Sequence, residues 1–174
     1  MKKLTAALIA GLFALGTSPA FSQSAAPNDA QIAGIVVAAN TVDIDAGKLA
    51  QNKSQNKEVK AFAKQMVTDH TGVNKQATAL VKKLKITPED SDTSKSLKES
   101  GDATLAKLKD LKGAQFDKAY VDNEVSYHQT VIDALDKTLI PNAKNAELKD
   151  TLVKVRPAFV AHLEHAKHIQ ASLK

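Results

Sequence analysis

The sequence predicts an all-α protein, a four-helix bundle with one long helical crossover between its second and third helices. The chain is rich in Ala, Leu and Lys, has few aromatic residues and has almost no Gly inside its periodic segments. Four long segments repeat apolar residues at helical spacing. Short connections join the first pair and the last pair of these segments, whereas a long connection joins the second to the third.

The first 22 residues, MKKLTAALIAGLFALGTSPAFS, have the pattern of a secretory signal peptide. Two lysines precede an apolar run, and small residues at Ala20 and Ser22 suit cleavage before Gln23. The apolar run is shorter than the roughly 20 residues that a membrane-spanning helix needs, and no later segment is long and apolar enough to be one. We therefore expect an exported, periplasmic protein without a transmembrane segment, with residues 23–174 as its single mature domain.

The composition excludes several classes of function. There is no cysteine, so disulfides and thiolate metal sites are excluded. The formal charge of +5 falls to +3 without Lys2 and Lys3, and the other lysines alternate with acids. The single arginine, Arg156, and the few aromatic residues argue against a nucleic-acid partner. Only a weak association with the anionic envelope surface is expected from this charge.

The first helix is expected from about Asp29 to Gln51, with Asn28 or Asp29 as its cap. A tight turn near residues 52–56 leads into the second helix, which should end near Leu84. The stretch 86–94 then contains Pro88 and turn formers, which break the periodic pattern.

A Lys-rich amphipathic segment, residues 94–111, follows and is interrupted by Gly101; we interpret it as the crossover. The third helix should run from Gly113 to about Leu139 and the fourth from about Asn145 to Leu173, with a kink at Pro157. This connectivity, with one long crossover, is that of ferritin-like bundles.

Polar residues interrupt the apolar stripe of every long helix. A Leu at such a position would contribute about 1.5–3 kcal/mol on burial, so polar groups there need partners. Counting residues from the turns places Asp43, Glu124 and His162 in one layer, and His70 and His128 in a second layer about 10 Å away. The polar residues on or beside the stripes are Asp43, Asp69, His70, Asp117, Glu124, His128 and His162.

Three segments carry a family resemblance: AGKLAQNKSQNKEVKAFAKQMVTDH, GAQFDKAYVDNEVSYH and RPAFVAHLEHA. They resemble the exported ferritin-like family known as domain of unknown function 4142. The recurring features of that family fall here on Met66, Asp69 and His70, on Phe116, Asp117, Tyr120 and His128, and on His162. The resemblance implies the fold and assigns no activity.

Known catalytic patterns are missing from the sequence. A di-iron site would need Glu three residues before its His ligands, but Val67, Val125 and Phe159 occupy those positions, so a di-iron centre is not expected. The chain has no cysteine nucleophile, no recognisable serine elbow and no Gly-rich phosphate loop. We therefore expect a non-catalytic protein.

Two interpretations of the polar residues remain. In the first, Asp43, His70, Tyr120, Glu124, His128 and His162, with Asp69 and Asp117, form a buried hydrogen-bonded network that fixes helix register. The protein would then have a binding role or an envelope and stress-associated role.

In the second interpretation, Asp43, His70, Glu124, His128 and His162 hold one transition-metal ion, copper, zinc or iron, with Met66 as a soft ligand for copper. The late histidines His162, His165 and His168 would bind metal only adventitiously at the surface.

Overall fold

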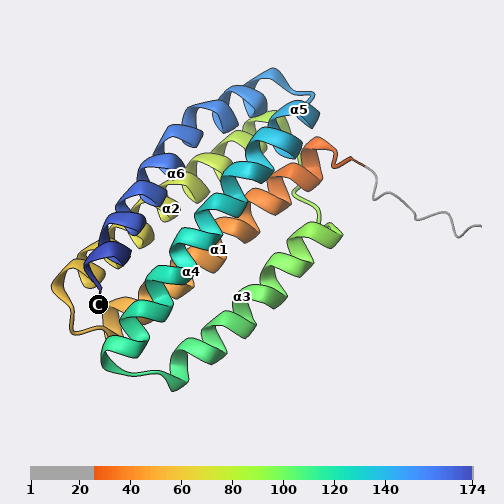
Figure 1. Ribbon diagram of the computed structural model, residues 1–174. Coiled ribbons are helices and arrows are strands. Elements are labelled where there is room, and N and C mark those ends of the chain that lie inside the picture. The colour runs from red at the N-terminus through yellow and green to blue at the C-terminus, as the bar shows by residue number, and fades with distance from the viewer. Residues whose placement is uncertain (1–25, 174) are drawn as a thin grey trace, which may run out of the picture.

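Five long helices and short turns make up nearly all of residues 26–173, the part of the chain that the computed structural model describes (Figure 1). The long helices are α1 (Asp29–Lys53), α2 (Lys57–Leu84), α3 (Asp92–Asp110), α4 (Gly113–Ala134) and α6 (Ala146–Ser172). A π-helical segment, η1 (Leu135–Leu139), and a short helix, α5 (Ile140–Asn142), connect α4 to α6. The prediction of an all-α four-helix bundle with one crossover helix is confirmed.

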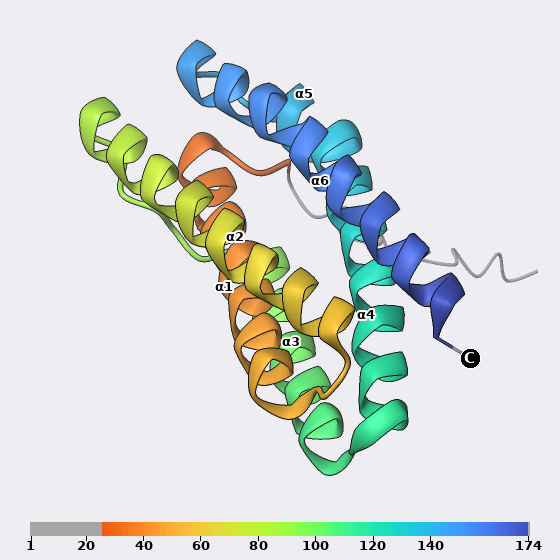
Figure 2. The same ribbon diagram turned by 90° about the vertical axis from the view of Figure 1, so that its left-hand side faces the viewer.

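Two helical hairpins form the bundle. Figure 2 shows α1 and α2 side by side as one hairpin, and α4 and α6 as the other. The crossover helix α3 lies on the outside of the bundle and packs chiefly along α1. The predicted signal peptide, residues 1–22, lies outside the described part. Among helices within residues 26–173, none is long and apolar enough to cross a membrane.

Side-chain caps fix where most of the helices begin. Asn28 and Gln31 form a capping box at the start of α1, and Ser91 forms one with Ser94 at the start of α3. Asn56 and Asn145 each accept two backbone amide hydrogens at the starts of α2 and α6. These caps place the helix starts close to their predicted positions.

Gly101 has a packing role that differs from the predicted interruption of the crossover. The helix α3 continues through it, and the residue is buried against α1. A Cβ atom at this position would lie 2.7 Å from Cγ2 of Val42. The missing side chain is therefore what lets α3 approach α1 closely.

The end of the third long helix also differs from its prediction as a regular helix ending near Leu139. Regular α-helix stops at Ala134, and the amide of Ile140 reaches back five residues to the carbonyl of Leu135. Pro141 follows directly; it has no amide hydrogen and its ring crowds the preceding turn, which a widened π turn accommodates. Pro157, in contrast, lies exposed within α6, and the helix runs through it uninterrupted.

The core consists of two apolar clusters separated by a polar layer. One cluster, around Phe62, Met66 and Phe116, lies toward the α1–α2 turn. The other, around Ile35, Leu135 and Leu152, lies toward the α5–α6 turn. The buried polar residues that come between the two clusters are Asn40, Asp43, His70, Glu124, His128 and His162.

Candidate metal centre

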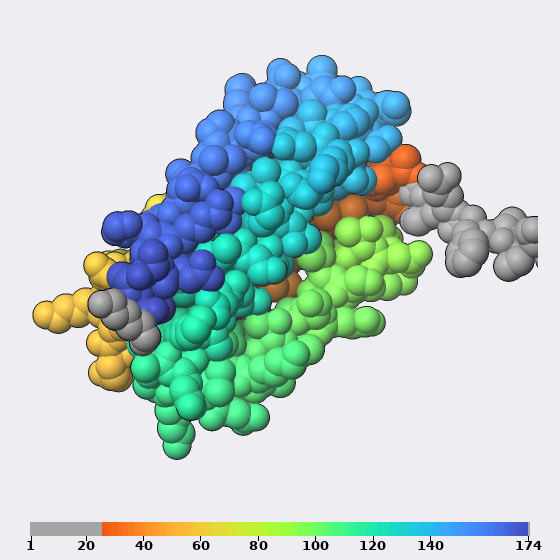
Figure 3. Space-filling model, viewed as in Figure 1, coloured from red at the N-terminus to blue at the C-terminus, as the bar shows by residue number. Residues whose placement is uncertain are grey.

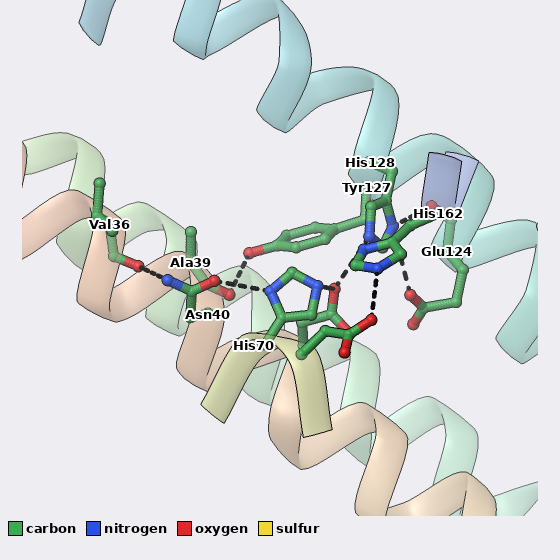
Figure 4. Close-up of polar contacts among 10 residues, drawn as sticks. Val36, Ala39, Asn40, His70, Glu124, Tyr127, His128 and His162 are labelled. Atoms are coloured by element: carbon green, nitrogen blue, oxygen red, sulfur yellow. Dashed lines mark hydrogen bonds and ion pairs between the residues drawn. The ribbon is translucent and has the colours of Figure 1, made fainter. Parts of the chain in front are cut away.

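A single buried layer gathers polar side chains from four helices (Figure 4). Asn40 and Asp43 come from α1, His70 from α2, Glu124 and His128 from α4, and His162 from α6. Each of these residues is at most 4% exposed. The bundle therefore places ionisable groups where solvent cannot compensate their charge.

The prediction of two polar layers about 10 Å apart is wrong. The Nε2 atom of His70 lies 3.1 Å from Oδ2 of Asp43, and Nε2 of His128 lies 3.5 Å from the same oxygen. The sequence count measured depth along both helices from one turn centre near residue 53, inside the predicted turn 52–56, whereas α2 begins only at Lys57. Measured from the observed helix ends, Asp43 is 10 residues deep and His70 is 13, an offset of about 4.5 Å that the side chains span.

The three imidazoles form a nearly equilateral triangle. The ring centroids of His70 and His128 are 5.6 Å apart, and that of His162 lies 5.4 Å from both. The ring of Phe159 stands edge-on to His70 at 5.1 Å and contacts the other two imidazoles at 6.2 Å. An apolar ring thus closes one side of the triangle.

Each imidazole is oriented by a hydrogen bond from its outer nitrogen. His70 donates through Nδ1 to Oδ1 of Asn40 at 2.7 Å, and the Asn40 amide in turn donates to the Val36 carbonyl at 2.9 Å. His128 donates through Nδ1 to the Glu124 carbonyl at 3.0 Å. His162 donates through Nε2 to Oδ2 of Asp69 at 2.9 Å. Because these oxygens only accept, each bond fixes the proton on the outer nitrogen.

Within residues 26–173, the inner nitrogens have no hydrogen-bond partner. His70 Nε2, His128 Nε2 and His162 Nδ1 are all buried and unpaired, and neither oxygen of Asp43 accepts a well-aligned hydrogen bond. One ring nitrogen from each of the three histidines lies within 4.8 Å of the others. Three unpaired ring nitrogens therefore belong to one buried cluster, and Oδ2 of Asp43 lies beside two of them.

Burial keeps two of the imidazoles neutral. It lowers the pKa of His128 to about 4, although Asp43 opposes the shift. It also lowers the pKa of His162, although the hydrogen bond that His162 donates to Asp69 opposes the shift. Burial by itself would raise the pKa of Asp43. The neighbouring histidines, His70 above all, lower this pKa by more than burial raises it, which favours the charged carboxylate.

Glu124 and Tyr120 lie next to the triangle, where burial favours their uncharged forms. Burial and the Asp43 charge raise the pKa of Glu124 well above its ordinary value, and both of its carboxyl oxygens lack a partner. Burial, Glu124 and Asp43 likewise raise the pKa of Tyr120. Asp43, Glu124 and His128 form a second group with ligand atoms within 4.8 Å of one another.

The comparisons with known proteins place the chain in a family. The family model described as a domain of unknown function, DUF4142, matches residues 14–169. The chain belongs to the DUF4142 family. No curated protein matches this DUF4142 chain in sequence.

Two solved structures share the fold of the DUF4142 chain. One is described as the crystal structure of a putative secreted protein DUF305 from Streptomyces coelicolor; it has 12% identity and a TM-score of 0.67, and the match covers 82% of this chain and 91% of that one. The other is CopM in the Cu(II)-bound form, with 15% identity and a TM-score of 0.65, covering 85% of this chain and all of the other. At these identities the likeness shows the fold alone.

The structure of the DUF4142 chain places the five residues predicted as metal ligands in two overlapping groups that share His128: His70, His128 and His162, and Asp43, Glu124 and His128. Asp69 is not part of the buried layer, since its side chain is 42% exposed, but it orients His162. Asp117 is buried almost two turns before Glu124, and its Oδ1 has no partner. Asn40 and Asp43 face the two ring nitrogens of His70.

Two further residues from the sequence analysis lie close to the layer. Met66 packs in the apolar cluster with Phe62 and Tyr120. His165 lies at the surface beside Gln65. Asn40 was missed by the sequence reasoning, although it lies one turn before Asp43 on the same apolar stripe and the same helical-wheel argument could have found it.

Proposed function

We propose that this protein binds one divalent transition-metal ion, copper(II) foremost, through His70, His128, His162 and Asp43. The observation that supports this most strongly is the set of three inner ring nitrogens. All are buried and unpaired, while the outer nitrogen of each ring is already hydrogen-bonded. Metal-binding histidines characteristically have such an outer partner, which fixes the tautomer and the ring orientation.

The spacing of the inner atoms suits a shared ion. Two ligands bound at about 2.0–2.1 Å lie roughly 2.9 Å apart when adjacent on a square-planar ion such as copper(II), and roughly 3.3 Å apart on a tetrahedral ion such as zinc. The separations of Asp43 Oδ2 from His70 Nε2 and His128 Nε2, 3.1 Å and 3.5 Å, lie close to these values. Without a cation or a proton between them, a ring lone pair and a carboxylate at such a distance repel each other.

The register-fixing network explains only part of the layer. It accounts for the outer nitrogens and for Asn40, but it leaves the inner nitrogens and both Asp43 oxygens without partners. Each unpaired buried polar group costs about 1–3 kcal/mol. A divalent ion satisfies all four groups at once and balances the Asp43 charge.

The donor set favours copper(II) or zinc. Imidazole with one carboxylate suits both ions, and the chain has no cysteine thiolate to select copper(I). Copper(II) is the stronger candidate, because divalent copper binds N and O ligands more tightly than zinc and a structural relative is described in a Cu(II)-bound form. The predicted signal peptide, together with a relative described as secreted, supports an exported protein.

The burial of the proposed ligands favours a protein that holds the ion over one that uses the ion in catalysis. A catalytic metal keeps an open coordination position for water or substrate, whereas these ligands are at most 4% exposed and Phe159 covers one side. We infer a role in sequestering or carrying the metal.

The test is thermal unfolding of untagged, metal-stripped protein with added copper(II) or zinc. At a free metal concentration of about 100 times Kd, the melting temperature of the wild type should rise by about 5–10 °C. The His128→Ala variant should lose this rise, whereas the matched His168→Ala variant at the exposed end of α6 should keep it. A rise that survives His128→Ala and disappears in His168→Ala would assign the binding to the surface histidines and refute the proposal.

A further inference from the structure

We propose that an apolar chamber between α3 and the bundle binds a small uncharged amphiphile, a short hydrocarbon body that carries one hydroxyl or carbonyl group. The chamber is distinct from the four proposed metal ligands, none of which lines it. The proposal therefore does not depend on metal binding.

The chamber has a volume of about 180 Å³ and is lined almost wholly by apolar side chains. All five long helices and η1 contribute to the lining, with Ile35, Leu97, Val131, Leu152 and Val155 among them. It exists because α3 packs along α1 and makes little contact with α4. Figure 3 shows the resulting groove, with α1 visible between α3 and α4.

Water is a poor occupant of this space. A buried water needs two to four polar partners, and the only polar side chain at the inner end is Asn40, whose amide already bonds the Val36 carbonyl and His70. Protein interiors contain few voids larger than a water molecule. An apolar cavity of about 150 Å³ is known to stay dry and to bind benzene, so an apolar body of similar size fits here.

The mouth of the chamber supplies the polar contacts. Thr93, Thr130 and Thr138 line it, and the first and last of these make no side-chain hydrogen bond within residues 26–173. Beyond them lies a wider polar hollow that shares Thr93 and Thr138 and contains both Asp92 and Lys95. Hydroxyl groups beside charges of both signs favour a head group that is polar but uncharged.

The first test compares 1-hexanol with hexane-1,6-diol on the full mature chain. Hexanol should raise the melting temperature in a dose-dependent and saturable way, because its hydrocarbon end fills the chamber. The diol should not, because it would bury an unpaired hydroxyl. No rise with hexanol, or equal rises with the two compounds, would overturn the proposal.

Variants locate the site. Ala134→Leu fills the chamber from α4 and should abolish the hexanol effect, whereas Ala158→Leu, on the exposed face of α6, should leave it intact. Methyl NMR of the wild type gives the same answer if Ala134→Leu fails to fold. Hexanol should shift the resonances of Leu97 and Val155, and shifts spread over surface methyl groups would refute the chamber as the site.

Discussion

The buried amide of Asn40 determines which nitrogen of the His70 ring carries the proton. Its oxygen accepts from Nδ1 of His70, and this leaves Nε2 of that ring facing Asp43. Loss of such an outer partner typically lowers metal affinity 10–100-fold even though no ligand is removed.

We therefore expect Asn40→Leu to weaken copper(II) binding by about 10–100-fold, as measured by competition with a chelator of known affinity. The matched variant Asn52→Leu, at an exposed position of α1, should bind as the wild type does. Equal affinity in the two variants would show that Asn40 does not orient a ligand.

The buried neutral His128 predicts acid sensitivity of the metal-free protein. Its pKa is about 4 in the folded chain, against about 6.5 in an unfolded one, so between these values the unfolded state binds more protons. Stability should accordingly fall by about 3 kcal/mol as the pH is lowered from 6.5 to 4. Urea unfolding across this range should show a shallower loss in His128→Gln than in His168→Gln; parallel pH profiles would contradict the assignment.

Glu124 predicts a pH dependence of stability opposite in sign to that of His128. Because the pKa of Glu124 is raised in the folded chain, the stability that this residue contributes is complete at acid pH and is lost as the pH rises. Replacement by the uncharged isostere, Glu124→Gln, should raise the free energy of unfolding of the metal-free protein by about 1 kcal/mol or more at pH 8. The gain should disappear near pH 4 and be absent in Glu99→Gln, which changes an exposed residue of α3.

The close approach of α3 to α1 depends on Gly101, because a Cβ there would meet Val42. Overpacking of this kind costs about 1–3 kcal/mol, more than the helix propensity that Ala gains over Gly. Gly101→Ala should therefore destabilise the protein in urea unfolding, and adding Val42→Ala should restore part of the loss. Gly72→Ala is the control, since nothing lies within 4 Å of its Cβ position and a stabilisation of up to about 1 kcal/mol is expected.

The helices could be predicted from sequence because their determinants are local. Asn28, Asn56 and Asn145 cap their own helices, and apolar spacing identified the buried face of each. The π-helical turn before Pro141 was not predictable by periodicity, since it changes the backbone hydrogen bonding and leaves the apolar pattern continuous.

The candidate ligand residues could be predicted for a similar reason, but their relative positions along the bundle axis could not. Asp43, His70 and His162 were identified as polar residues on apolar stripes, a property of each helix alone. Their positions along the bundle axis depend on where the interhelical turns lie. An error of one helical turn in these positions was enough to divide one layer into two.

At the scale of the whole molecule, the proposed ion would lie on the seam between the two hairpins. Asp43 and His70 belong to the α1–α2 hairpin, and His128 and His162 to the α4–α6 hairpin. Each hairpin is continuous in sequence, and α3 alone connects them covalently.

The metal would then act as a removable cross-link in a chain that has no cysteine. A disulfide fixes two segments permanently under oxidising conditions, whereas coordination bonds can be released by acid or by a competing ligand. Delivery of the ion to an acceptor would remove the coordination bonds between the two hairpins. Release of the metal would therefore also weaken the packing of the two hairpins against each other.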